Sequence, residues 1–226
     1  MIDVTDMIRR PAIFRAKDIN SFERPRLFEE ALSGAIIQHG RGLYSSTRYN
    51  ISDAEALLFH SPEAIGTLDT ALWIHGLLDR PPKRIWISIA SKARRPHVPP
   101  LQIETLRNAS SPPEADVLTT RLSTKGPLFQ VFQLPRLAVE FIRARNRIGI
   151  EHAYAMAVRI ILHVDRVELM ACAVRCGVAR PMRDFLANPP PRDPMDRLRA
   201  PRQLTPQCAT PTSGGSQWPS PSASRG

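Results

Sequence analysis

The stretch PRLFEEALSGAIIQHGRGLYSS, residues 25–46, carries the strongest indication of the fold in this chain. Pro25 suits the first turn of a helix, apolar side chains then recur on one helical face, and Gly34 ends the helix. Two short apolar segments follow on either side of Gly40 and Gly42, which is typical of a β-hairpin with a glycine-bearing turn. The stretch therefore predicts a helix followed directly by a small hairpin.

Two further short helices are predicted upstream, over residues 3–10 and 13–19. Three short helices followed by a hairpin are the layout of a winged helix-turn-helix, in which the third helix enters the major groove and the hairpin forms the wing. The sequence thus predicts a winged helix-turn-helix DNA-binding domain over residues 1–48. The alternative is an ordinary helix and hairpin whose arginines face solvent.

Basic side chains stand where such a domain would touch DNA. Arg24 and Arg26 lie at the start of the third helix, where the helix dipole and free amides also favour phosphate. Arg41 lies at the wing tip, within reach of a phosphate or the minor groove. Glu29 and Glu30 on the same helix would repel phosphates unless they face solvent or read cytosine amino groups. The predicted DNA-binding residues are Arg15, Lys17, Arg24, Arg26, His39 and Arg41.

The charge of the whole chain agrees with an acidic partner. The formal net charge is +10 and the sequence pI is about 10.5, and nucleic acid is the commonest partner of such a protein. Most of the excess positive charge lies in the centre of the chain rather than in residues 1–48. The central clusters, Arg94 with Arg95 and Arg143 with Arg145 and Arg147, are open to three interpretations: a second DNA contact, a partner-binding face, or a solvated surface.

The rest of the chain predicts an α+β fold, with short strands followed by a helical bundle in a domain spanning residues 49–187. Ser52 and Glu55 form the pattern of a capping box at the start of one helix. A second helix is expected over 67–75, with His75 interpreted as a structural histidine. Strands are expected at 84–90, 101–106, 117–122 and 128–132, and helices at 135–148, 150–162, 167–176 and 181–186.

Residues 188–226 are rich in proline and serine, and we expect a disordered tail because they cannot bury enough apolar surface. The three cysteines make neither a disulfide framework nor a zinc site, so Cys172 and Cys176 are interpreted as small core residues. No stretch approaches the roughly 18 apolar residues of a membrane span, and no signal peptide is evident. We expect a cytoplasmic protein without a membrane partner.

Catalytic motifs are missing from the sequence. It contains no Walker loop, Gly-x-Ser-x-Gly elbow or His-Glu-x-x-His. A restriction-type nuclease needs a Glu-x-Lys pair to hold a metal, but residues 104–106 read Glu-Thr-Leu. A nucleotidyltransferase needs a Gly-Ser turn followed by paired aspartates, but residues 33–34 read Ser-Gly and no such pair follows. We therefore expect no enzyme activity, no cofactor and no metal.

Four segments, taken in order, resemble one family. They are GRGLYSS at 40–46, GTLDTALWIHGL at 66–77, RNRIGIEHAYAMAV at 145–158 and ELMACAVRCGVARPMRDFL at 168–186. Together they span roughly residues 10–187 and are similar to segments of the AbiEi-like antitoxins and transcriptional regulators of type IV toxin–antitoxin systems. The chain departs from that family in its short region before the wing, in Glu140 where an aspartate is frequent, and in its tail.

The resemblance implies an antitoxin that binds inverted repeats of double-stranded DNA in its own promoter and represses its operon. It also implies a nucleotidyltransferase-like toxin as functional partner, without need of a stable complex, and self-association on DNA. Residues 49–187 would then be the antitoxin domain. The alternative function is a protein-binding module of the same fold that no longer binds DNA.

Overall fold

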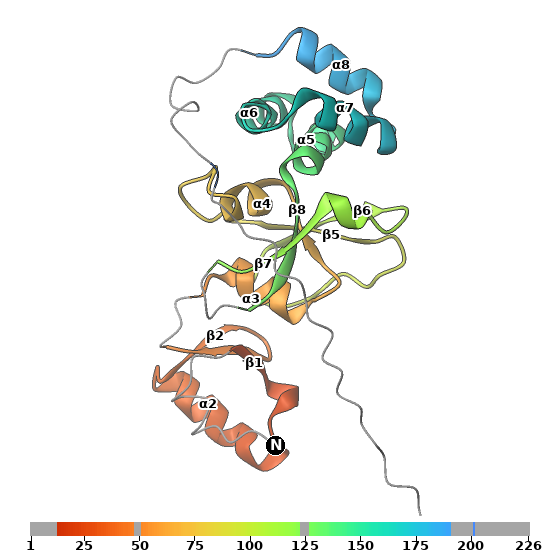
Figure 1. The fold of residues 1–226 in the computed structure, drawn as a ribbon. Helices are drawn as coiled ribbons and strands as arrows, with labels where there is room; N and C mark the ends of the chain where they lie inside the picture. Colours follow the sequence, from red (N-terminus) through yellow and green to blue (C-terminus); the bar gives the residue numbers. More distant parts are fainter. Residues whose placement is uncertain (1–12, 48–50, 123–126, 191–200, 202–226) are drawn as a thin grey trace, which may run out of the picture.

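The computed structural model describes residues 13–47, 51–122, 127–190 and 201, and these residues form a mixed α+β fold with seven α-helices and two β-sheets (Figure 1). The expected α+β class is confirmed. The helix predicted over 3–10 and nearly all of the predicted tail, 191–200 and 202–226, lie outside the described residues.

Residues 13–47, called here the N-terminal unit, contain a three-stranded antiparallel sheet and one α-helix. Its elements are β1 (Ile13–Arg15), two 3-10 turns (Ala16–Asp18 and Ser21–Glu23), α2 (Arg24–Leu32), β2 (Ile36–Gly40) and β3 (Leu43–Ser46). The strand order is β1-β3-β2. The helix predicted over 13–19 is wrong, because Ile13 pairs with Ser45 and Arg15 with Leu43 in the sheet. Pairing with a distant strand therefore overrides the local preference of a short segment.

A small core of its own lies beneath α2. Leu27 of α2 and Phe14, Ile36 and Tyr44 of the strands are each at most 4% exposed and pack together. The rings of Phe14 and Tyr44 stack with centroids 6.1 Å apart, and such pairs add to the stability that burial provides. Gly34 follows α2 with a φ of +79°, as the predicted helix end requires.

The second sheet has five strands in the order β6-β5-β4-β8-β7. They are β4 (Ile65–Gly66), β5 (Ile85–Ala90), β6 (Ile103–Asn108), β7 (Val117–Thr120) and β8 (Phe129–Phe132). Four of them match the predicted strands, whereas the two-residue β4 was not predicted. β5 is buried along residues 85–89 on both of its faces, which follows from cover on both sides of the sheet.

Helix α3 (Asp53–His60) lies between the N-terminal unit and the sheet, and α4 (Leu68–Ile74) packs against β5 (Figure 1). The predicted capping box is confirmed: the Glu55 amide donates to Ser52 Oγ at 3.2 Å, and the Ser52 amide donates to Glu55 Oε2 at 3.0 Å. His75 donates from Nε2 to the Phe132 carbonyl at 2.8 Å, which agrees with its structural interpretation. Burial lowers the pKa of His75, so the ring is held neutral.

Four helices lie on the side of the sheet opposite α3, and α6, α7 and α8 among them pack against α5 (Figure 1). They are α5 (Leu134–Ile148), α6 (Ile150–Ile161), α7 (Arg166–Arg175) and α8 (Ala179–Ala187). One continuous apolar core runs from α3 through the sheet to α8. Within the described ranges, no helix combines the length and the apolar character needed to cross a membrane.

Candidate nucleic-acid interface

The tip of the β2–β3 hairpin packs directly against the loop that follows β5. The Arg41 amide donates to the Pro99 carbonyl at 3.0 Å. A Cβ atom on Gly40 would lie 2.5 Å from Val98 Cγ1 and 3.0 Å from the Pro99 oxygen, so glycine is required for this approach. Gly42 has a φ of +76° and closes the turn. The hairpin thus carries Arg41 to a loop more than 50 positions further along the chain.

A pocket of about 510 Å³ lies at this junction. Its charged and titratable lining residues are Arg41, His60, Glu63, Arg94, Arg95 and His97. We call it the junction pocket. Arg41 and Arg94 are exposed and form no ion pair with an acidic residue in the described ranges. Arg95 donates to the Ile103 carbonyl, which fixes its position. Three arginines therefore face a single glutamate, and the pocket favours an anion.

Two more predicted residues, Arg15 and Lys17, lie near His60 of the junction pocket. Burial, followed by the charges of Arg15 and Lys17, lowers the pKa of His60, while Asp18 opposes this shift. Arg15 donates from Nη2 to the Phe59 carbonyl at 3.2 Å and lies over the Phe59 ring, so it also ties the N-terminal unit to α3. Lys17 is exposed. The positive charge around the pocket therefore continues into the N-terminal unit.

The two predicted cations of α2 differ in their acidic neighbours. Arg24 and Arg26 are exposed at the start of the helix. Arg26 lies 4.0 Å from Glu23 and 3.8 Å from Glu30, both at the outer limit of an ion pair. Neighbouring acids thus partly offset its charge, whereas Arg24 has no described acidic partner.

His39 is the predicted DNA contact that the structure does not support. Its side chain is 5% exposed. Nδ1 donates to Asp53 at 3.0 Å and Nε2 lies 2.9 Å from Ser45 Oγ. We correct the prediction, because both ring nitrogens are engaged within the protein and none faces solvent. His39 instead joins β2 to the start of α3.

The two central basic clusters lie in different surroundings. Arg143 lies 2.8 Å from Glu140 and donates to Asn108 at 3.0 Å. Arg145 donates to the Ile142 carbonyl at 2.7 Å. Arg147 bridges Glu104 and the Thr105 carbonyl and covers the Trp86 ring. Arg143 and Arg147 therefore hold α5 to β6, whereas Arg145 binds within α5. Of these two clusters, Arg94 and Arg95 line the junction pocket.

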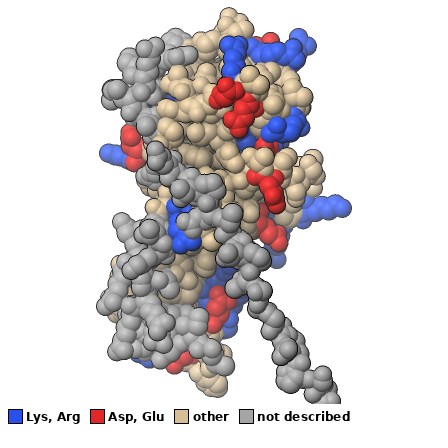
Figure 2. All heavy atoms as spheres, viewed as in Figure 1, with Lys and Arg blue, Asp and Glu red and all other residues tan. Residues whose placement is uncertain are grey.

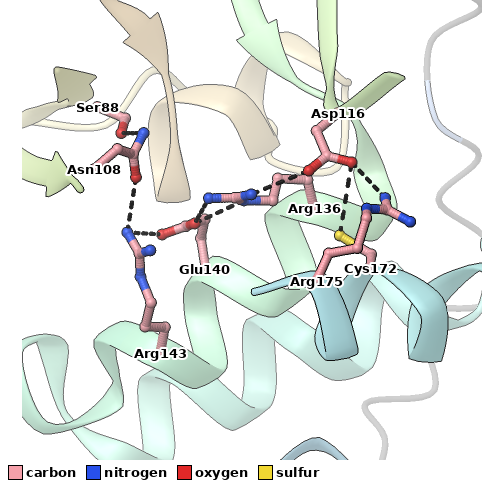
Figure 3. A network of polar contacts seen from close by, with 8 residues as sticks. All are labelled: Ser88, Asn108, Asp116, Arg136, Glu140, Arg143, Cys172 and Arg175. Atoms are coloured by element: carbon pink, nitrogen blue, oxygen red, sulfur yellow. Dashed lines mark hydrogen bonds and ion pairs between the residues drawn. The ribbon is translucent and has the colours of Figure 1, made fainter. Parts of the chain in front are cut away.

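A buried polar network, drawn in Figure 3, joins the sheet to α5 and α7. Glu140 is fully buried and binds Arg136 at 2.7 Å as well as Arg143. Arg136 also binds Asp116 at 3.0 Å, and Arg175 binds the other oxygen of Asp116 at 2.6 Å. Asn108 completes the chain by donating to Ser88. Sequence reasoning missed this network because nothing in the periodicity marks a buried ion pair.

A second pocket of about 590 Å³ lies beside Trp86. It joins two of the family-like segments, because His152 of one lies 3.0 Å from Asp69 of the other. Glu104 lies 3.8 Å from Arg84 and 3.0 Å from Arg147. Most of the charged residues that line this second pocket are paired, so it attracts an anion less strongly than the junction pocket does.

Total charge is a poor guide to the interface. On the face seen in Figure 2, Lys and Arg side chains are dispersed along the molecule and lie beside Asp and Glu side chains. The +10 net charge therefore does not form one continuous patch on that face. The convergence of Arg41, Arg94 and Arg95 is the more informative feature.

Comparison with known proteins adds little to this geometry. No protein-family model and no curated protein sequence matches the chain. Among solved structures, it is similar to the crystal structure of the RV2827C protein from Mycobacterium tuberculosis, with 15% identity and a TM-score of 0.47 over 81% of this chain and 79% of that chain. A likeness at this level carries no argument about function.

Proposed function

We propose that this protein is a DNA-binding regulator that contacts duplex DNA with its N-terminal unit and its junction pocket. The convergence of Arg41 with Arg94 and Arg95 carries the proposal. Two separate segments supply these cations, and no described acid pairs with Arg41 or Arg94. Exposed arginines that lack acidic partners are the groups that neutralise backbone phosphates.

The N-terminal unit is proposed to act as a winged helix-turn-helix. Support comes from the order of its elements, since α2 is followed by a hairpin whose β3 pairs with β1. In this arrangement α2 enters the major groove and the hairpin forms the wing. The Ala16–Asp18 turn stands in place of a full second helix. Arg24, at the start of α2, is placed to meet a phosphate.

The resemblance to AbiE-type antitoxins extends the proposal. The protein would bind repeats in its own promoter, repress its operon, and counter a nucleotidyltransferase-like toxin. Association of two copies on the repeats would match the symmetry of such an operator. Residues 49–187, which contact the N-terminal unit through α3, would then form the antitoxin domain.

The test is a gel-shift titration on the DNA immediately upstream of the protein's own start codon, against scrambled DNA of equal length and composition. Titrations at two salt concentrations separate phosphate contacts from base readout, because only the former depend strongly on salt. Tight, sequence-dependent binding supports an autoregulator. Equal, weak binding to both DNAs would contradict it and favour a protein-binding module.

A further inference from the structure

A pair of thiols ends the buried network on α7. Cys172 is buried and Cys176, four positions further at the end of the helix, is half-buried. Their sulfur atoms and a carboxylate oxygen of Asp116 all lie within 4.8 Å of one another, and both cysteines are free thiols. The proposed DNA contacts use neither residue.

We infer that Cys172 and Cys176 form a reactive thiol pair that a hydroperoxide oxidises to an intramolecular disulfide. The half-buried Cys176 is the thiol that attacks and the buried Cys172 is the thiol that resolves. This order follows from access, because a peroxide reaches the outer sulfur first.

The surroundings of Cys176 favour its thiolate. A hydrogen bond from Cys172 lowers the pKa of the Cys176 thiol to about 7, with help from the charge of Arg136 and against the effect of burial. The same hydrogen bond and burial raise the pKa of Cys172. One sulfur is therefore a nucleophile near neutral pH and the other keeps its proton, as a stepwise oxidation requires.

The reaction balances with one equivalent of hydroperoxide. The Cys176 thiolate attacks the peroxide oxygen, the O–O bond breaks, and hydroxide leaves, so that Cys176 becomes a sulfenic acid. The Cys172 sulfur then attacks the Cys176 sulfur, and the sulfenic oxygen leaves as water with the Cys172 proton. Two thiol sulfurs are oxidised and the peroxide is reduced to water.

Helix geometry permits the bond. Residues four apart in a helix have Cα atoms about 6 Å apart, within the roughly 4.4–6.8 Å that disulfides span. Cys176 is the residue that ends α7, with φ −90° and ψ 0°, so only the last turn must adjust. The disulfide would take from Asp116 its contact with the Cys172 thiol, 3.9 Å away.

The same three side chains are a poorer site for a metal ion. Both oxygens of Asp116 already accept from guanidinium groups, Oδ2 from Arg136 and Oδ1 from Arg175. A divalent cation would have to displace them and would lie beside two positive charges. The arrangement favours thiolate over metal.

Peptide mapping of the full chain tests the inference. Trypsin cuts after Arg175, so the two thiols fall in separate peptides, residues 167–175 and 176–183. After brief treatment of the folded protein with dilute hydrogen peroxide and alkylation with iodoacetamide, we expect these two peptides as one disulfide-linked species. Cys172→Ser should instead accumulate a sulfenic acid on Cys176 that dimedone traps. Cys208→Ser, which removes the third cysteine of the sequence, should behave like the parent chain.

Two further measurements separate reactivity from mere packing. The rate of Cys176 alkylation should rise with pH with a midpoint of about 7 in the folded protein and at the ordinary thiol value in urea. Peroxide that leaves both peptides fully alkylated, or that links Cys208 equally well, would overturn the inference. Stoichiometric Zn²⁺ binding that is lost in Cys176→Ser would also overturn it, because the pair would then be a metal site.

Discussion

The arginines around the junction pocket and the arginines of the buried network have opposite surroundings. Arg41 and Arg94 are exposed and have no described acidic partner, whereas Arg136 is 6% exposed and bound to both Glu140 and Asp116. A paired, buried guanidinium holds elements of the fold together. An exposed and unpaired one adds almost nothing to stability and remains available to an anionic partner.

Removal of Glu140 should give the largest effect on stability. Glu140→Ala removes one of the two acidic partners of the buried Arg136 and the carboxylate that pairs with Arg143. We therefore expect the free energy of unfolding to fall by about 3–5 kcal/mol. Urea denaturation followed by circular dichroism measures it. Glu29→Ala, on an exposed site of α2, is the control and should change stability by less than about 0.5 kcal/mol. A small loss in Glu140→Ala would mean that the network does not hold the fold.

The small core of the N-terminal unit provides the next test. Leu27 is fully buried among a few residues only, and Leu27→Ala should cost about 2–4 kcal/mol. Hydrogen exchange should show the loss of protection mainly in residues 13–47, while β5 and α5 keep theirs. An equal loss of protection across both regions would show that the two cores unfold as one unit.

DNA affinity should distinguish two arginines that the sequence treats alike. Arg41→Ala should weaken duplex binding more than Arg26→Ala, because Glu23 and Glu30 already lie near Arg26. We expect about one unit of the log–log salt slope to be lost for Arg41→Ala and less for Arg26→Ala. Fluorescence anisotropy at several salt concentrations measures both. The reverse order would place α2, rather than the pocket, at the centre of the interface.

The smallest effect concerns the half-exposed pair of His152 and Asp69. The hydrogen bond that His152 donates to Asp69 raises the pKa of His152, so the pair stabilises the fold fully below about pH 6.5 and loses this contribution as pH rises through the folded pKa. Asp69→Asn should therefore destabilise the protein by less than about 1 kcal/mol, more at pH 5.5 than at pH 8.5. Thermal unfolding at the two pH values checks the sign. An equal loss of stability at the two pH values would show that the ion pair of His152 and Asp69 does not stabilise the fold.

The elements with a long, regular pattern are among those that the sequence predicts most closely. The alternating isoleucines of β5 and the amphipathic α5 were predicted within one or two residues, as was the capping box of α3. The three residues of β1 and the two of β4 are too short to show a period, and pairing with distant strands alone fixes them. Local pattern does not carry that information.

The candidate site was predicted by residue type but not by arrangement. Arg41 and Arg94 were both selected from the sequence, yet their proximity depends on Gly40 allowing the hairpin to approach Val98. His39 is predicted to contact DNA and is instead buried between Asp53 and Ser45. The helical spacing of Arg136 and Glu140 gave no sign of their burial, because the third partner, Asp116, comes from a distant turn.

The salt dependence of duplex binding tests the central claim most directly. The variant Arg41→Ala/Arg94→Ala/Arg95→Ala removes the three cations of the junction pocket, and Arg166→Ala/Arg180→Ala/Arg183→Ala removes three exposed cations of α7 and α8 with the same change in net charge. We predict that the log–log salt slope falls by about two to three units in the pocket variant and stays at the parent value in the control. Equal slopes for the two variants would contradict the claim that DNA binds at the junction pocket.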